Sequence, residues 1–181
     1  MPHLATTLPG CVLRTWRAAD KADLVRHANN RRVWRNMTHT FPHPYTTDDA
    51  DLWLKIAANP GPSIQLAIDV EGVAAGGVGV IAGEGIYCAT AQFGYWLGEP
   101  FWGRGIATAA ATALCDRIAA ERLFARLEAQ VFDWNPASMR VLEKAGFTRD
   151  AVLRSAATKD GMLIDTVLYS RVLAASGVVA P

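Results

Sequence analysis

The residues best suited to chemistry lie in one run, from Gly94 to Thr108, which reads GYWLGEPFWGRGIAT. An apolar, strand-like segment ends there in a short turn, and glycines then open an alanine-rich segment with the pattern of a helix. A helix that begins in this way presents backbone N–H groups without partners and the positive end of its dipole. Such a helix start binds phosphate. We therefore predict a phosphate site where the strand ending near residue 97 meets a helix over 104–121.

The composition of this run strengthens the prediction. Gly103 and Gly105 let the backbone approach a ligand closely and adopt left-handed conformations. No acidic residue follows until Asp116, although Asp or Glu commonly complements the dipole in a first helical turn. A ligand anion can take that place, and Arg104 adds positive charge. The alternative is a purely structural turn whose glycines serve close packing.

Two better-known phosphate motifs do not fit. The run from Gly77 to Gly83 approaches a dinucleotide fingerprint, but its last glycine comes one place late and a further strand follows instead of a helix. The run from Gly98 nearly spells a P-loop, yet Arg104 and Gly105 stand where Lys and Ser or Thr are required. The sequence therefore argues against both nucleotide-binding motifs.

A second cluster extends from Asn135 to Phe147 and reads NPASMRVLEKAGF. Asn135 before a proline is typical of a helix N-cap. Gly146 ends the same helix with a left-handed residue, followed by the apolar Phe147. Ser138 lies one turn into this helix. Capping alone explains Gly146 and Phe147, whereas Asn135 is open to either a capping or a ligand-binding role.

Together the two segments resemble the signature segments of the GNAT N-acetyltransferases, most closely the RimJ/RimL-type branch. The run Trp102–Ala107 is similar to the family pattern Gln/Arg-x-x-Gly-x-Gly/Ala, with Trp102 at the first position. The resemblance implies an acetyl-CoA-dependent N-acetyltransferase, with acetyl-CoA as co-substrate and no metal. The acceptor would be a primary amine, either a protein N-terminal amine or a small molecule, that attacks directly in a ternary complex.

The resemblance also implies how the coenzyme binds. The strand ending at residue 97 would part from the strand 123–132, and the pantetheine arm would pair with the first strand's backbone. Residues 103–108 would hold the pyrophosphate. As side chains, Tyr95 and Trp96 are expected to serve packing. The predicted coenzyme-binding residues are Tyr95, Trp96, Leu97, Gly103, Arg104, Gly105, Ile106, Ala107, Thr108 and Asn135.

Acetyl transfer needs a neutral amine and benefits from a proton donor near the departing thiolate. Many relatives place a tyrosine where this chain has Leu142, which cannot donate. Ser138 occupies the position of a serine proposed as the acid in RimJ/RimL-type enzymes. Glu128 is the candidate base, with Asp133 or a chain of waters as alternatives. Gln92, where some relatives have a glutamate, cannot take a proton.

The aromatic-rich segment 31–45 is expected to be irregular and to form part of the acceptor wall, because loops carry much of the specificity in such folds. Its predicted substrate-binding residues are Trp34, Phe41 and Tyr45. A loop that only covers the sheet is the alternative. His39 and His43 are not expected to bind metal, because the prolines beside them prevent a helix that would bring them together.

Composition limits the class of protein. The chain has 181 residues, 51% of them apolar, and a formal net charge of +1. One domain over residues 1–181 with a substantial core is expected, and neither a membrane span nor a basic nucleic-acid surface. Its three cysteines form no CxxC pair and suit a reducing compartment. With no signal peptide recognised, we expect a cytoplasmic protein of unknown oligomeric state.

The elements that would position these residues follow a mixed α/β order. Strands are predicted over 11–17, 63–70, 73–82, 87–97, 123–132, 147–157 and 162–173. Helices are predicted from Asp20 to about residue 29, from a Thr46–Asp49 capping pair to about residue 58, and over 104–121 and 136–145. This gives a GNAT-like, mostly antiparallel sheet of about seven strands flanked by helices, with a splay between the fourth and fifth strands and a frayed tail at 174–181.

Two other functions stay open at this point. One is a catalytically silent acyl-CoA-binding regulatory module, which retention of Ser138 disfavours. The other is an RNA-associated factor, which the near-neutral charge and the lack of a basic aromatic stripe disfavour.

Overall fold

An open sheet of eight strands forms the centre of the computed structural model, which describes residues 3–173; the predicted tail at 174–181 lies outside the described residues. The strand order is β1-β2-β3-β4-β5-β6-β8-β7. The strands are β1 (His3–Ala5), β2 (Cys11–Thr15), β3 (Ile64–Val70), β4 (Val73–Ala82), β5 (Thr90–Leu97), β6 (Arg126–Phe132), β7 (Thr148–Lys159) and β8 (Met162–Val172). The helices are α1 (Lys21–Ala28), α2 (Arg31–Trp34), α3 (Thr47–Ala58), α4 (Ile106–Glu121) and α5 (Pro136–Lys144).

This architecture confirms the mixed, mostly antiparallel fold and corrects three details. The sheet has eight strands rather than about seven, because the three residues of β1 pair with β2 at one edge. So short a strand carries too little alternation to be recognised. Part of segment 31–45, expected to be irregular, forms the short helix α2. The strand expected from residue 87 begins at Thr90, because Gly85–Tyr87 form a 3-10 turn.

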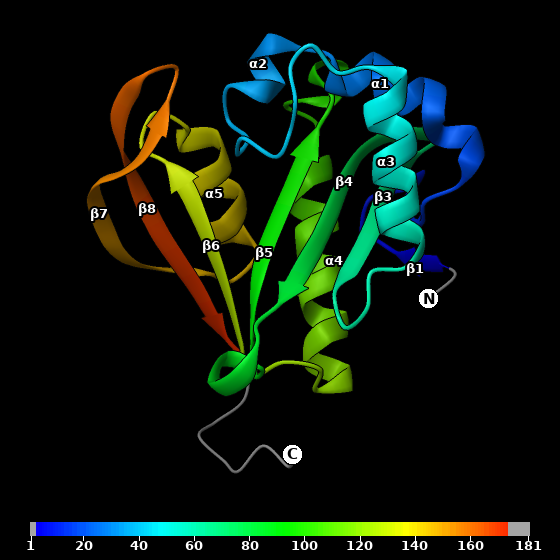
Figure 1. Ribbon diagram of the computed structural model, residues 1–181. Helices are drawn as coiled ribbons and strands as arrows, with labels where there is room; N and C mark the ends of the chain where they lie inside the picture. The colour runs from blue at the N-terminus through cyan, green and yellow to red at the C-terminus, as the bar shows by residue number, and fades with distance from the viewer. Residues whose placement is uncertain (1–2, 174–181) are drawn as a thin grey trace.

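The predicted splay lies between β5 and β6, which form the only parallel pair among the described strands. Their pairing runs from Thr90 opposite Arg126 to Gln92 opposite Glu128 and then stops. Beyond Gln92, β5 continues to pair with β4 but not with β6. The two strands therefore open like a V, which Figure 1 shows with its narrow end at the bottom and α2 near the top.

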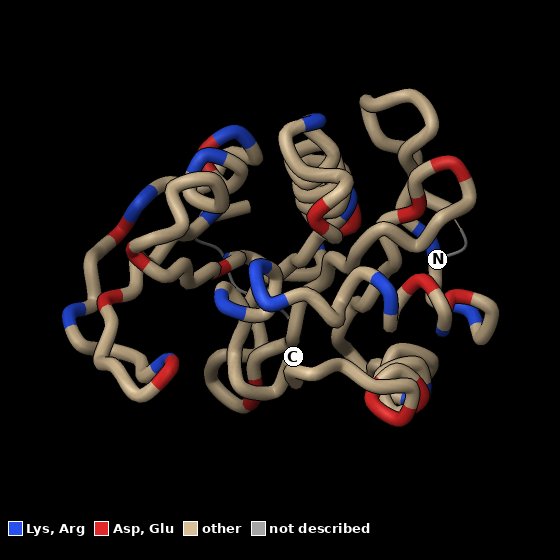
Figure 2. The backbone as a smooth tube through the Cα atoms, turned by 90° about the horizontal axis from the view of Figure 1, so that it is seen from above, with Lys and Arg blue, Asp and Glu red and all other residues tan. Residues whose placement is uncertain are grey.

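Helices cover both faces of the sheet. In the view from above, α4 and α5 lie on one side and α3 on the other (Figure 2). Alternation along β5 supplies both cores: Phe93 and Leu97 pack with Leu114 of α4, whereas Trp96 packs with Tyr45 and the helices on the opposite side. The opening between β5 and β6 therefore lies between two different cores, one against α4 and one around Trp96 and Tyr45.

Local signals fix the helix starts. Thr46 and Asp49 form the predicted capping box of α3, and the Asn135 side chain accepts from the Ser138 N–H at 3.1 Å at the start of α5. Asp20 precedes α1 as predicted, but its side chain does not cap that helix.

Asp20 instead belongs to a buried charge network. It receives two hydrogen bonds from the Arg14 guanidinium, at 2.7 and 2.8 Å, and Arg14 Nε donates to Asp69 at 2.6 Å. Arg14 is 2% exposed, and its ion pairs raise its pKa further. Removing one partner of such a network leaves a buried charge unpaired, so this network fixes β2 against β3 and α1.

Candidate active site

A cavity of about 1140 Å³ occupies the splay. Its walls come from β4, β5 and β6, from the start of α4, from α5, and from α3 with the 36–45 segment before it. Of the residues predicted from sequence, it is lined by Phe41, Tyr45, Tyr95, Trp96, Leu97, Gly103, Gly105, Ile106, Ala107, Thr108, Glu128, Asn135 and Ser138. The fold thus brings the predicted coenzyme, catalytic and acceptor residues to one cavity, and it leaves Trp34 and Arg104 outside the lining.

The turn before α4 has the backbone geometry expected of a phosphate site. Gly103 and Gly105 have φ values of +74° and +76°, and a Cβ on either would meet nothing within 4 Å. Gly105 is the N-cap residue of α4, and the first turn of α4 holds no acidic residue. The N–H groups of the first turn therefore face the cavity without an intrahelical partner, together with the positive end of a helix of 16 residues.

The side chains around this turn brace it. Trp102 Nε1 donates to the Leu97 carbonyl at 2.7 Å, which closes the turn between β5 and α4. The Arg104 guanidinium lies over the Phe101 ring, 5.8 Å from its centroid, and Arg104 is not among the residues that line the cavity. The turn therefore lines the cavity through Gly103 and Gly105 rather than through Arg104.

Across the splay, β5 and α5 are joined by two hydroxyls. The Tyr95 Oη lies 2.6 Å from Ser138 Oγ and within hydrogen-bonding distance, 3.2 Å, of the Ser138 carbonyl oxygen. Burial raises the pKa of Tyr95 to about 12, against the smaller opposing effect of the Ser138 hydrogen bond, so the tyrosine stays protonated at neutral pH. The sequence predicts coenzyme contacts from the Tyr95 backbone and packing from its side chain, and its spacing gives no sign of this side-chain pairing across 43 residues.

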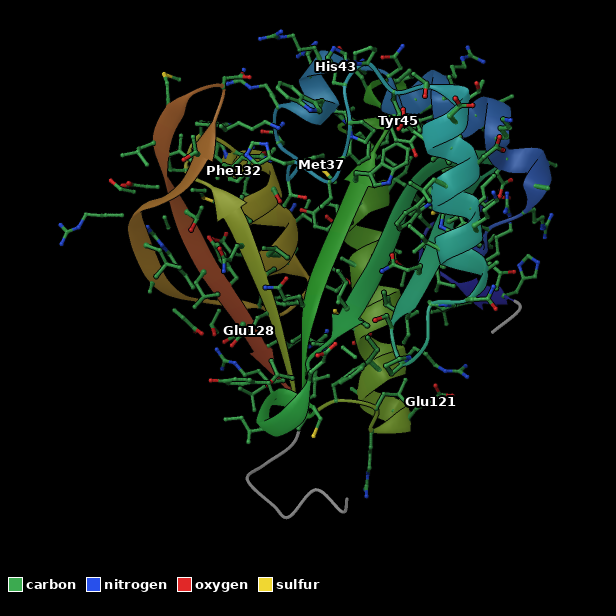
Figure 3. All side chains as sticks on the ribbon, in the orientation of Figure 1. Met37, His43, Tyr45, Glu121, Glu128 and Phe132 are labelled. Atoms are coloured by element: carbon green, nitrogen blue, oxygen red, sulfur yellow. The ribbon has the colours of Figure 1, made fainter. Side chains whose placement is uncertain are left out.

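Glu128 lies on the other face of the sheet, at the last paired step before the strands part. Because aligned residues of paired strands point to the same face, Gln92 and Glu128 lie side by side there. One Glu128 oxygen accepts from Arg126 Nε at 2.7 Å, and Arg126 also binds Asp150 at 2.7 Å. Figure 3 shows Glu128 near the narrow end of the V. Asp133 is exposed and outside the cavity lining.

The cavity wall predicted to face the acceptor is aromatic. Phe41 packs on Tyr45 and Trp96, with ring centroids 5.3 and 5.6 Å apart, and Tyr45 is 5% exposed. Burial raises the pKa of Tyr45 to about 12, with a smaller contribution from Asp49. Figure 3 places Met37 and Tyr45 near the wide end of the V. Three large apolar side chains extend this wall although they are about half exposed: Leu52, Ile56 and Ile81.

A buried lysine from the distant β7–β8 hairpin holds this wall in place. Lys159 is 2% exposed, donates from Nζ to the Met37 carbonyl at 2.9 Å, and lies 3.6 Å from the centroid of the Trp34 ring. Burial lowers the pKa of Lys159. Trp34 thus packs on Lys159 and on His43 rather than lining the cavity. The sequence did not predict this role for Lys159. A lysine beside the turn dipeptide Asp160–Gly161 is expected on the exposed surface of a hairpin.

A smaller hollow of about 180 Å³ adjoins the cavity beside the turn before α4. Arg32 lies over the Trp102 ring and Arg35 over the Trp134 ring, at 5.5 and 5.6 Å from the centroids. Trp134 Nε1 donates to Asn36 at 3.1 Å. In Figure 2 the basic residues of α2 lie over the middle of the molecule. The hollow combines cationic side chains with aromatic rings, and no sequence motif predicted it.

Comparison with known proteins identifies the family. Residues 11–148 match the family model described as Acetyltransferase (GNAT) domain. The chain belongs to the GNAT acetyltransferase family. This assignment confirms the resemblance drawn from the Gly94–Thr108 and Asn135–Phe147 segments and makes the chain a member of an acyltransferase family.

Curated relatives match over shorter segments. The Uncharacterized N-acetyltransferase p20 of Bacillus licheniformis is 34% identical over 80 residues, which cover 44% of this chain and 45% of that protein. The Probable N-acetyltransferase YjcK of Bacillus subtilis (strain 168) is 40% identical over 76 residues, covering 42% of each. The matched segments therefore span less than half of either relative.

Solved structures match over nearly the whole chain. A RimL ribosomal L7/L12 alpha-N-protein acetyltransferase in complex with coenzyme A has a TM-score of 0.83 at 20% identity, covering 94% of this chain and 98% of that one. A spermidine N-acetyltransferase from Vibrio cholerae in complex with CoA and spermine has a TM-score of 0.77 at 18% identity, covering 92% and 97%. At these identities the likeness establishes the fold, which this chain shares with both enzymes.

Residues 3–173 lack two other kinds of feature. No helix there combines the length and hydropathy needed to cross a bilayer. No group of three or more His, Cys, Asp and Glu side chains in that range has the spacing of a metal site.

Proposed function

We propose that this protein is an acetyl-CoA-dependent N-acetyltransferase that transfers the acetyl group to a primary amine by direct attack in a ternary complex. One observation carries the proposal: a single cavity in the β5–β6 splay reaches both the N-terminus of α4 on one side and an aromatic wall on the other. Two substrates can therefore meet between the strands from opposite sides. The family membership supports the same chemistry.

The coenzyme is proposed to occupy the α4 side. The N–H groups at 105–108 would bind the pyrophosphate, and the edge of β5 that β6 leaves unpaired would pair with the pantetheine amides. The hollow formed by Arg32, Arg35, Trp102 and Trp134 suits the phosphorylated, aromatic adenosine end of the coenzyme. Trp102 and Asn135 line both the hollow and the main cavity, so the two are continuous.

The chemistry would divide between the two faces of the sheet. On the coenzyme side, Ser138 would donate a hydrogen bond to the departing sulfur, and a strand N–H would meet the tetrahedral oxyanion. On the acceptor side, Glu128 would take the proton of the incoming ammonium, directly or through water. The C–N bond forms, the C–S bond breaks with its electron pair on sulfur, and the surplus proton on nitrogen leaves toward base or solvent.

The acceptor is proposed to be an amine carried on an apolar body, such as a protein N-terminus or a small aliphatic or aromatic amine. The wall consists mainly of Phe41, Tyr45, Trp53, Leu52, Ile56 and Ile81. Among the described lining residues the carboxylates are Asp49 and Glu128 alone. A polyamine would need more negative charge than these two residues supply.

The test is a coenzyme-release assay with acetyl-CoA and a panel of amines, followed by mass spectrometry of the products. The panel holds peptides with apolar N-terminal residues, phenethylamine, amino acids and spermidine. We expect acetylation of the apolar amines at the highest kcat/KM. Preferred acetylation of spermidine would overturn the acceptor class. Tight acetyl-CoA binding without transfer to any member would instead indicate the catalytically silent module.

A further inference from the structure

The hydroxyl of Tyr95 has a geometry that packing does not require. Its ring is partly buried beside Phe93, yet its Oη reaches across the splay to Ser138 Oγ at 2.6 Å. Ser138 is simultaneously held by its backbone N–H, which donates to Asn135 at 3.1 Å. The serine is therefore fixed from two sides, by the N-cap of its own helix and by a side chain from β5.

The number of hydroxyl protons in the Tyr95–Ser138 pair decides whether Ser138 can donate a hydrogen bond into the cavity. Each hydroxyl has one proton to donate. If Tyr95 donates to the Ser138 carbonyl, 3.2 Å away, the serine proton is free to go to Tyr95 and none points into the cavity. If Tyr95 donates to Ser138 Oγ, the serine proton is released to the cavity. A sulfur with developing negative charge would favour the second arrangement, because donors that are themselves hydrogen-bonded are polarised.

We propose that Tyr95 is a positioning residue that orients and polarises Ser138, so that the serine donates its proton in a hydrogen bond to the coenzyme sulfur. The inference rests on the proposed coenzyme site but not on the identity of any acceptor. Neither hydroxyl gives up its proton in the step: the sulfur takes the electron pair of the broken C–S bond, and the nitrogen loses the proton that balances it. Burial keeps Tyr95 neutral, as its raised pKa indicates.

The first readout needs no acceptor. Free coenzyme A is bound to the protein and its thiol is titrated by ultraviolet thiolate absorbance. Removing a hydrogen bond to a charged group costs about 1.5 kcal/mol or more, so Ser138→Ala should lower the ratio of thiolate to thiol at a fixed pH by about tenfold. Tyr95→Phe, which acts one bond further away, should lower it by about threefold.

The double variant distinguishes a positioning role from direct contact. If Tyr95 acts through Ser138, adding Tyr95→Phe to Ser138→Ala should change the thiolate ratio no further. Tyr169→Phe is the matched control. It removes the hydroxyl of a buried tyrosine that donates at 3.0 Å to Glu143, which lies on α5 as Ser138 does. It should leave the ratio unchanged, and calorimetry should give a similar coenzyme Kd for all variants.

Each outcome bears on one claim. An unchanged ratio in Tyr95→Phe, or an equal effect of Tyr95→Phe with and without Ser138, overturns the inference. The same variants are then assayed with the best acceptor of the panel, where kcat should fall about threefold for Tyr95→Phe at constant KM for acetyl-CoA. If the thiolate ratio follows the expected order while no amine is acetylated, the proposed function fails and the inference stands.

Discussion

The two sides of the splay are built in different ways. On the proposed coenzyme side, the groups that would bind the pyrophosphate follow one another along the chain, in a local turn with two left-handed glycines. On the acceptor side, the wall is assembled from α3, β4 and a loop that a lysine of the β7–β8 hairpin holds from 122 residues away. Backbone groups dominate one side and packed side chains the other. The coenzyme side should therefore tolerate no change at a few glycines, whereas the acceptor side should respond gradually to loss of its supports.

The largest effect is expected at Gly105. Gly105→Glu places a carboxylate and a side chain where the pyrophosphate is proposed to bind, and we expect the Kd for acetyl-CoA to rise at least about 100-fold, or about 2.7 kcal/mol. Isothermal titration calorimetry measures it. Gly72→Glu is the control, because Gly72 also has a positive φ and open space but lies outside the cavity lining. Equal coenzyme affinity in the two variants would remove the pyrophosphate from this turn.

Glu128→Gln tests the acceptor side at its narrow end. Glutamine can still accept from Arg126 but cannot take a proton, so we expect kcat to fall about 100-fold while the Kd for acetyl-CoA stays the same. Asp150→Asn, which removes the negative charge of the other partner of Arg126, should have a much smaller effect. The pH–rate profile decides the role: if the profile of Glu128→Gln keeps the wild-type shape, a chain of waters rather than Glu128 takes the proton.

A smaller, purely acceptor-side effect is expected from Lys159. Lys159→Met preserves the length and the apolar stem but removes the hydrogen bond to the Met37 carbonyl. Loosening the wall by one hydrogen bond should raise the KM for the acceptor about fivefold and leave the KM for acetyl-CoA unchanged. Lys55→Met on α3 serves as the control, because Lys55 is exposed. A change in both KM values would mean that the two sides are not independent.

The smallest effect concerns stability alone. His27 packs against Phe101 and Gly98 behind the coenzyme turn, and burial, followed by the charge of Arg26, lowers its pKa. The unfolded chain therefore binds a proton first as the pH falls. The free energy of unfolding should be unaffected by His27 above about pH 6.5 and should decrease as the pH falls from there toward the lower folded-state pKa.

Urea unfolding at a series of pH values measures this contribution. His27→Leu should flatten the acid side of the curve while leaving acetyl transfer at neutral pH unchanged. If wild type and variant lose stability in parallel between pH 6.5 and 5, the acid sensitivity comes from other groups.

The sequence by itself determined the family, the order of most elements and the backbone turn before α4. These depend on short-range physics: the left-handed glycines before α4, the missing acidic residues in its first turn, and the caps at Thr46 and Asn135 are each specified within a few residues. The sequence did not predict the edge strand β1 or the short helix α2, because neither is long enough to show a hydrophobic period.

Only the tertiary structure decided which side chains meet. The Tyr95–Ser138 pair, the Lys159 contact with Met37 and the Arg14–Asp20–Asp69 network join residues from separate elements. It also turned Trp34 toward Lys159 and Arg104 over Phe101. No local signal encodes these contacts, because the register of the sheet and the parting of β5 from β6 fix them, and both depend on packing across the whole chain.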